Sequence, residues 1–178
     1  RQLKAYYEKN PVFAVLGGIS NREWQPIHTF CEEQRLPCLF PITELPTVSE
    51  TGWYTYYFNK GYTQEGEAAA RFLAGMNNVS AQTPILQVVQ DSPTGKALAS
   101  AFQESWKELE RPAVTTLMFT AAQLRNKTAL SKLLAAHKPG ILLLWTDAAR
   151  LRELPALLTR AGAPGMVFVS SSYMGKQT

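Results

Sequence analysis

Short apolar runs rich in β-branched and aromatic residues alternate along this chain with longer stretches whose apolar residues recur every three or four positions. The short runs predict strands, the longer stretches predict amphipathic helices, and their alternation is typical of parallel βαβ units. Several runs are apolar almost throughout, as expected for strands that helices cover on both faces. We therefore expect an α/β fold with parallel-sheet βαβ lobes. The predicted strands are 12–16, 38–41, 54–58, 84–89, 113–119, 141–146 and 166–170.

The stretches between the strands each carry one apolar face with helical spacing. The predicted helices include 24–31, 98–109, 130–137 and 151–158. Pro155 fits the first turn of the last helix, or else kinks it. A polar stretch at 59–64, followed by an alanine-rich run, joins two βα series. We expect it to divide the chain into part of a first lobe, residues 1–60, and most of a second lobe, residues 61–178.

The composition excludes several classes of protein. With 46% apolar and 18% charged residues, the 178-residue chain can bury a core and is expected to fold. Its longest apolar runs fall far short of the roughly 20 residues that cross a bilayer. The net charge of +4 arises from basic residues scattered among fourteen acidic ones, without a basic stripe interleaved with aromatic residues. We therefore expect no nucleic-acid partner.

The two cysteines, Cys31 and Cys38, belong to no CxxC pair and have no histidine cluster near them, so a zinc site lacks support. We expect two buried thiols. A disulfide in an oxidising compartment is the open alternative, because the sequence does not supply its geometry. No metal and no tightly held redox cofactor is expected, since the cysteines, histidines and acids never reach ligand spacing.

Catalytic motifs are missing from the sequence. It lacks the GxSxG, GxxxxGK[ST] and GxGxxG patterns of common acyl-transfer, nucleotide and dinucleotide sites. His28 and His137 are expected to pack or to lie on the surface, because neither belongs to a partner motif. Glu32 and Glu33 are adjacent on a predicted helix and point in different directions, so we interpret them as a solvated face. We expect that the protein is not an enzyme.

Polar residues follow five of the predicted strands. In parallel sheets, ligands gather beyond the carboxyl ends of the strands, where loops enter helices. A helix starting near Asn21 would present backbone N–H groups to an anionic ligand. The candidate ligand-binding residues are Ser20, Asn21, Thr43, Asp91, Thr94, Asp147 and Ser172. Taken singly, each is also an ordinary helix cap or turn former, and their shared position is the stronger argument.

Three segments follow one another in a suggestive order. In the first, a strand ends in Gly17-Gly18-Ile19-Ser20, and a helix then leads to Arg35-Leu-Pro-Cys-Leu-Phe-Pro41. In the second, the aromatic segment 52–58 precedes the run 62–70. The third, 85–109, has the pattern of a strand, an Asp-containing turn, a glycine and a long helix. This order resembles the branched-chain amino-acid binding proteins of ABC transporters, within the type I periplasmic-binding-protein superfamily. The likeness covers essentially the whole chain and implies the flavodoxin-like α/β fold of this superfamily. Because members of the family are longer, it also implies that the chain is a central fragment.

The resemblance implies roles for several candidates. Ser20 and Asn21 match the first-lobe loop that grips the carboxylate of the ligand, and Thr43 matches the residues after the next strand. Thr94 stands near a position where amino-acid binders often have an aromatic residue. Ser172 stands where an acidic residue often holds the ammonium group of the ligand.

The serine at position 172, where the family often has an acid, affects which ligands the site could bind, because a buried ammonium group needs a compensating charge. With Ser172 at that position, recognition of an α-amino group would require Asp147, Asp91 or Glu44 instead.

The function implied by the resemblance is solute binding for ABC-type uptake. A small polar solute, an amino acid or related carboxylate, would be captured between two lobes in the periplasm or outside the cell and passed to an ABC permease. A ligand-sensing domain of a receptor with the same fold is the first alternative, and a flavodoxin-like enzyme is the second. We also expect the fragment to dimerise through its exposed sheet edge.

Overall fold

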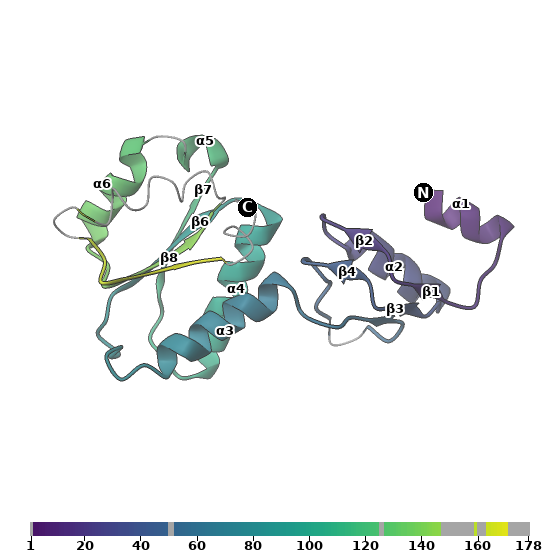
Figure 1. The fold of residues 1–178 in the computed structure, drawn as a ribbon, viewed down its shortest axis with the longest axis horizontal. Coiled ribbons are helices and arrows are strands. Elements are labelled where there is room, and N and C mark those ends of the chain that lie inside the picture. The colour runs from purple at the N-terminus through teal and green to yellow at the C-terminus, as the bar shows by residue number, and fades with distance from the viewer. Residues whose placement is uncertain (1, 50–51, 125–126, 147–158, 160–162, 171–178) are drawn as a thin grey trace. The chain divides into compact units, whose positions relative to one another are not determined.

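The chain folds into two compact units, unit 1 (Arg1–Tyr62) and unit 2 (Thr63–Thr178), which are drawn in Figure 1. The computed structural model describes residues 2–49, 52–124, 127–146, 159 and 163–170. Both units are α/β with parallel strands, so the predicted fold class is confirmed. Among the described residues, no helix combines the length and the apolar character needed to cross a membrane.

The strands of unit 1 are only two residues long. The elements are α1 (Gln2–Lys9), β1 (Val15–Leu16), β2 (Ile19–Ser20), α2 (Gln25–Gln34), β3 (Cys38–Leu39), β4 (Ile42–Thr43) and β5 (Thr55–Tyr56). One parallel sheet has the order β1-β3-β5, and β2 and β4 form a second parallel pair. Such short strands make few ladder hydrogen bonds, so this unit depends on other contacts.

Helix α2 ends in a reversal that brings β3 back beside it. Its C-cap, Arg35, has a left-handed backbone with φ +50°, and the Leu36 N–H donates to the Cys31 carbonyl at 2.9 Å. Cys38 then lies with its Cα 6.1 Å from that of Cys31, and the two form a disulfide. The expectation of two buried thiols is therefore wrong, because the helix-end reversal supplies the geometry that the sequence alone did not. The bonded pair forms the core of unit 1 together with Phe30 and Leu36.

Unit 2 contains a parallel sheet of longer strands in the order β7-β6-β8-β9. Its elements are α3 (Tyr62–Ala74), β6 (Ile85–Gln90), α4 (Pro93–Glu108), β7 (Thr115–Phe119), α5 (Ala121–Leu124), α6 (Lys127–His137), β8 (Ile141–Trp145) and β9 (Met166–Val169). Every residue of β8 is buried, and so are the first five of β6. Gly66 lets α3 approach α4 closely, because a Cβ there would lie 2.4 Å from the Leu98 carbonyl oxygen.

A buried glutamine links three of these strands. Gln87 of β6 has no exposed surface; its Oε1 accepts from Trp145 Nε1 at 2.7 Å, and its Nε2 donates to Thr116 Oγ1 at 2.9 Å. Gln103 of α4 donates to the same hydroxyl oxygen at 2.8 Å. Because an unpaired buried amide is costly, the network favours the one register that pairs all these groups.

All seven predicted strands are present, most of them shorter than predicted. The pair β2 and β4 was missed because its residues were interpreted as the polar loops that follow strands 12–16 and 38–41, and α1 was missed because its short polar sequence buries no side chain. The helix predicted near Asn21 begins later, at Gln25. Helices 24–31, 98–109 and 130–137 correspond to α2, α4 and α6, whereas predicted helix 151–158 lies outside the described residues.

Removing the disulfide should destabilise the protein. In a Cys31→Ala/Cys38→Ala variant, the unfolded chain regains the loop freedom that the cross-link removes, and loop-closure entropy predicts a loss of about 2–3 kcal/mol in the free energy of unfolding. Urea denaturation of both proteins measures this loss. The control is a thiol assay of the denatured, unreduced wild type, which should detect no free thiol because the sequence has two cysteines. Two titratable thiols would contradict the assignment.

Candidate functional site

The carboxyl ends of β1 and β3 continue, after a bend, into β2 and β4. The Gly17 N–H donates to the Leu39 carbonyl at 2.8 Å before the bend, and the Ile42 N–H donates to the Gly18 carbonyl at 2.8 Å after it. Gly17 and Gly18 make their side of the bend with φ +67° and +103°, where a side chain would be strained. The bend therefore holds two parallel segments together just beyond the sheet.

Ser20 and Thr43 are register partners in this pair of segments. Both hydroxyls meet the carbonyl of Arg22: Ser20 Oγ donates to it at 3.3 Å and Thr43 Oγ1 at 3.5 Å. Each hydroxyl oxygen also accepts a backbone N–H, from Arg22 at 3.1 Å and from Leu45 at 3.1 Å. The structure therefore brings these two predicted residues together, and both stabilise the turn that leads into α2.

The Trp24 side chain packs against the bend. It is buried, and a Cβ on Gly18 would lie 2.8 Å from its ring, so the indole packs directly on the glycine backbone. Its backbone N–H donates to the Leu45 carbonyl at 3.2 Å. Within the part of the chain that is described, its Nε1 is buried without a hydrogen-bond partner.

Asn21 is exposed at the tip of the same turn. The first turn of α2 offers fewer donors than expected, because the helix starts four residues later and carries Pro26, which has no N–H, in its first turn. Sequence reasoning thus placed the helix terminus too close to Asn21. The side chain of Asn21 is exposed on this turn.

In unit 2, the end of β6 forms a tight turn into α4. The Asp91 N–H donates to the Phe119 carbonyl at 2.7 Å, and the Asp91 carboxylate pairs with Lys96 at 2.7 Å. Ser92 caps the helix by accepting the Gly95 N–H at 3.1 Å. Thr94 is half-buried in the first helical turn. The predicted residues Asp91 and Thr94 therefore flank one helix N-terminus at the carboxyl edge of the sheet.

Two further polar contacts line that edge. Thr146, which follows β8 and is fully buried, donates to Gln90 Oε1 at 3.1 Å. Ser170, which follows β9 and is also fully buried, donates to Glu65 Oε2 at 3.1 Å. Sequence reasoning missed Glu65, because it lies on α3, 105 positions from the serine, and no local pattern marks it.

Asp147 and Ser172, the last two predicted ligand-binding residues, lie outside the described residues. Across the described ranges, no group of three or more histidine, cysteine or acidic residues has the arrangement of a metal site.

No protein-family model matches the chain, and no curated protein matches its sequence. Solved structures do match its fold. A branched-chain amino acid ABC transporter structure from Silicibacter pomeroyi superposes with a TM-score of 0.67 at 11% identity, over 93% of this chain and 44% of that one. An ABC transporter solute-binding protein from R. palustris in complex with benzoate gives 0.62 at 12%, over 94% and 46%. A leucine-binding protein from Thermotoga maritima gives 0.60 at 16%, over 93% and 47%.

These similarities confirm the expected fold. The chain has the parallel α/β fold of the type I periplasmic binding proteins. It spans less than half the length of each of the three structures.

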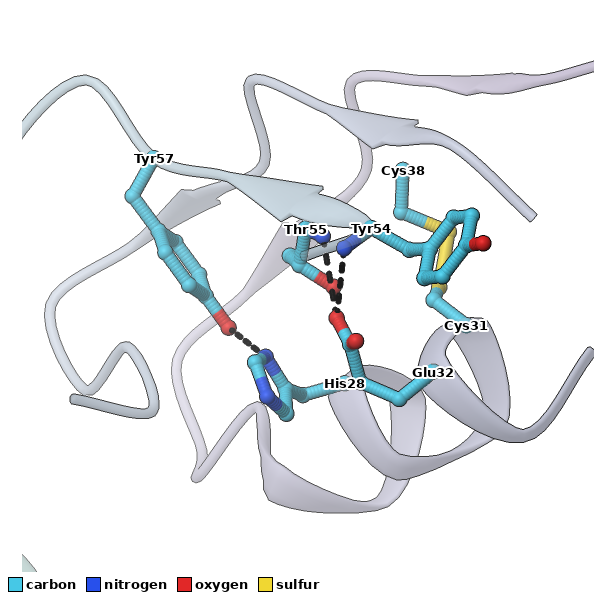
Figure 2. The surroundings of a disulfide bond; sticks show 7 residues. All are labelled: His28, Cys31, Glu32, Cys38, Tyr54, Thr55 and Tyr57. Atoms are coloured by element: carbon cyan, nitrogen blue, oxygen red, sulfur yellow. Dashed lines mark hydrogen bonds between the residues drawn. A yellow bond between two sulfur atoms is a disulfide. The ribbon is translucent and has the colours of Figure 1, made fainter. Parts of the chain in front are cut away.

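The segment that ends in β5 is held by one carboxylate of α2, as Figure 2 shows. Glu32 accepts three consecutive backbone N–H groups: Trp53 on Oε2 at 2.9 Å, and Tyr54 and Thr55 on Oε1 at 2.9 and 3.1 Å. The interpretation of Glu32 as part of a solvated face is therefore wrong. Its neighbour Glu33 is exposed, as expected.

His28, one turn before Glu32, contacts the same segment. It is buried, its Nδ1 lies 3.1 Å from Tyr57 Oη, and its ring stacks on that of Tyr57 (Figure 2). The Tyr57 hydroxyl also accepts the Thr47 N–H at 3.3 Å. The predicted packing role of His28 is confirmed. Burial raises the pKa of Tyr57, and the charge of Glu32 raises it further, whereas the hydrogen bonds with Thr47 lower it.

The pKa of Glu32 is lowered from its ordinary 4.5. Burial raises it, but the N–H groups of Trp53, Tyr54 and Thr55 and the nearby His28 favour the ionised form and outweigh burial. A carboxyl whose pKa is lower in the folded state stabilises the fold fully above 4.5. That contribution is lost as the pH falls through the folded-state pKa.

Glu32→Gln should remove this stabilisation while leaving the shape of the side chain unchanged. We expect a loss of about 1–2 kcal/mol in the free energy of unfolding at pH 7, in the lower range for charge-assisted hydrogen bonds because the carboxylate is partly solvated. The difference from wild type should shrink as the pH falls below 4.5, because the unfolded chain is protonated at Glu32 there while the folded state takes up the proton only at lower pH. Urea denaturation at several pH values measures both effects. Glu33→Gln is the matched control, and equal losses in the two variants would refute the assigned role.

Proposed function

We propose that this chain is the central part of a solute-binding protein that serves an ABC-type uptake system. The observation that carries the proposal is the fold similarity to ABC solute-binding proteins over more than nine-tenths of the chain. The polar turns at the carboxyl edges of the sheets in both units support it, because ligands of open parallel sheets bind at that edge. The whole protein would bind and release its solute without transforming it.

The proposed solute is a small carboxylate. Leucine and benzoate, which are named for two of the similar structures, share a carboxylate and little else. In this chain, the exposed amide of Asn21 and the hydroxyl of Thr94 are the predicted donors. Asp91, one of the three acids considered for an ammonium group, already pairs with Lys96.

The surroundings of the histidines support a function without catalysis. His28 is buried against Tyr57, and His137 is exposed at the end of α6, so neither offers an imidazole beside a nucleophile at the strand ends. Compartment follows from the disulfide, because such bonds persist where the surroundings are oxidising. We therefore propose a periplasmic or extracellular location.

Native mass spectrometry of the full-length protein, purified from its own host, tests the proposal. A bound mass that corresponds to a small carboxylate supports it, and turnover of that solute by the purified protein would contradict it.

Single-residue variants test the proposed donors. Asn21→Ala and Thr94→Val should each raise the dissociation constant of the co-purified solute about three- to tenfold, because each removes one hydrogen bond to a charged group. Isothermal titration measures the constants. Asn10→Ala, which changes an exposed asparagine beyond α1, is the control and should have no effect. If both site variants stay folded and bind within twofold of wild type, this site is wrong.

A further inference from the structure

Phe40 has a backbone conformation that is rare for an aromatic residue. Its φ is +58°, in the left-handed region, and the residue precedes Pro41, which restricts its backbone further. The other non-glycine residues of the described chain with positive φ are Arg35, Glu110 and Lys138, and each lies just past a helix, where this conformation is ordinary. Phe40 alone among them lies between two strands, β3 and β4.

The strain is maintained by fixed backbone on both sides. The Phe40 N–H donates to the Tyr56 carbonyl at 2.8 Å, and the Ile42 N–H donates to the Gly18 carbonyl at 2.8 Å. The neighbouring segment makes the same bend with Gly17 and Gly18, which adopt positive φ without strain. Folding alone would therefore be served better by glycine at position 40. A bulky residue in a strained conformation points to a function for its side chain.

The bend places the Phe40 ring on that of Phe58, which follows β5. The ring centroids lie 4.4 Å apart at an interplanar angle of 20°. The two residues are 44% and 77% exposed, and neither belongs to the core that α2 closes. This aromatic pair therefore stands open at the carboxyl edge of the sheet, on the strand that continues to Thr43.

We propose that the Phe40–Phe58 pair is the specificity-determining platform of the solute site and that it stacks against an aromatic ring of the solute. The inference rests on the proposed function and narrows the solute class to aromatic carboxylates. An open π-face accepts a further ring at stacking distance, a contact that adds affinity beyond burial of the same area. A saturated ring of equal size gains the burial without the stacking.

Benzoate and cyclohexanecarboxylate are matched probes, because they share the carboxylate and similar size and differ in the aromatic face. The full-length protein should bind benzoate about three- to tenfold more tightly than cyclohexanecarboxylate in isothermal titration. Phe58→Leu and Phe40→Gly should abolish this preference. Phe40→Gly should also unfold at a temperature no lower than wild type, since the glycine relieves the strained backbone. Phe13→Ser, which removes another exposed aromatic ring, is the control and should leave the preference unchanged.

The outcomes separate this inference from the proposed function. Tight binding of leucine with no preference for benzoate would overturn the inference and leave the proposed function intact. Binding of no carboxylate at all would overturn both. A lower unfolding temperature in Phe40→Gly and Phe58→Leu with unchanged benzoate preference would show that the pair packs against another part of the polypeptide, and this would also overturn the inference.

Discussion

Three consecutive backbone N–H groups, those of Trp53, Tyr54 and Thr55, are satisfied by the carboxylate of Glu32. This contact has unusual weight because the strands of unit 1 are two residues long and make few ladder bonds. The adjacent residue on the helix, Cys31, is bonded to β3, so the last turn of α2 holds two of the three strands of the sheet. The pair β2 and β4, which carries Ser20 and Thr43, continues the chain from β1 and β3 of that sheet. In unit 1, the helix therefore organises the sheet.

The sequence predicted the strands because their apolar runs are a local signal, and it predicted the edge of the sheet because polar residues follow those runs. It did not predict what holds unit 1 together. The Glu32 contacts span more than twenty positions, and the side chain reads as one more charge on a polar helix face until β5 lies opposite it. The disulfide likewise depended on the left-handed turn at Arg35, a conformation that its side chain does not favour.

The candidate site likewise has features that local sequence signals predict and features that only the folded structure determines. The position of Ser20 and Thr43 could be predicted, because both follow strands and the carboxyl ends of parallel strands share an edge. Their hydrogen bonds to the Arg22 carbonyl could not, since these depend on how residues 20–24 turn before α2. The Ser170–Glu65 contact joins residues 105 positions apart, and the stacking of Phe40 on Phe58 follows from a backbone angle. Long-range geometry of this kind leaves no periodicity to read.

The two units depend on different interactions, and this difference bears on the strain at Phe40. In unit 2, long buried strands and the Gln87 network define the register, so the sheet stabilises its own edge. In unit 1, the core is small, so backbone strain of the order of 1–3 kcal/mol at one residue is a large fraction of the folding free energy that the core can supply. The α2 cross-links make such strain tolerable, because they hold β3, which leads into the bend, and its neighbour β5 in place. Folding does not require the strained backbone at Phe40, and the strain lies in the unit with the small core. We therefore attribute it to the role of the Phe40 side chain at the edge of the sheet.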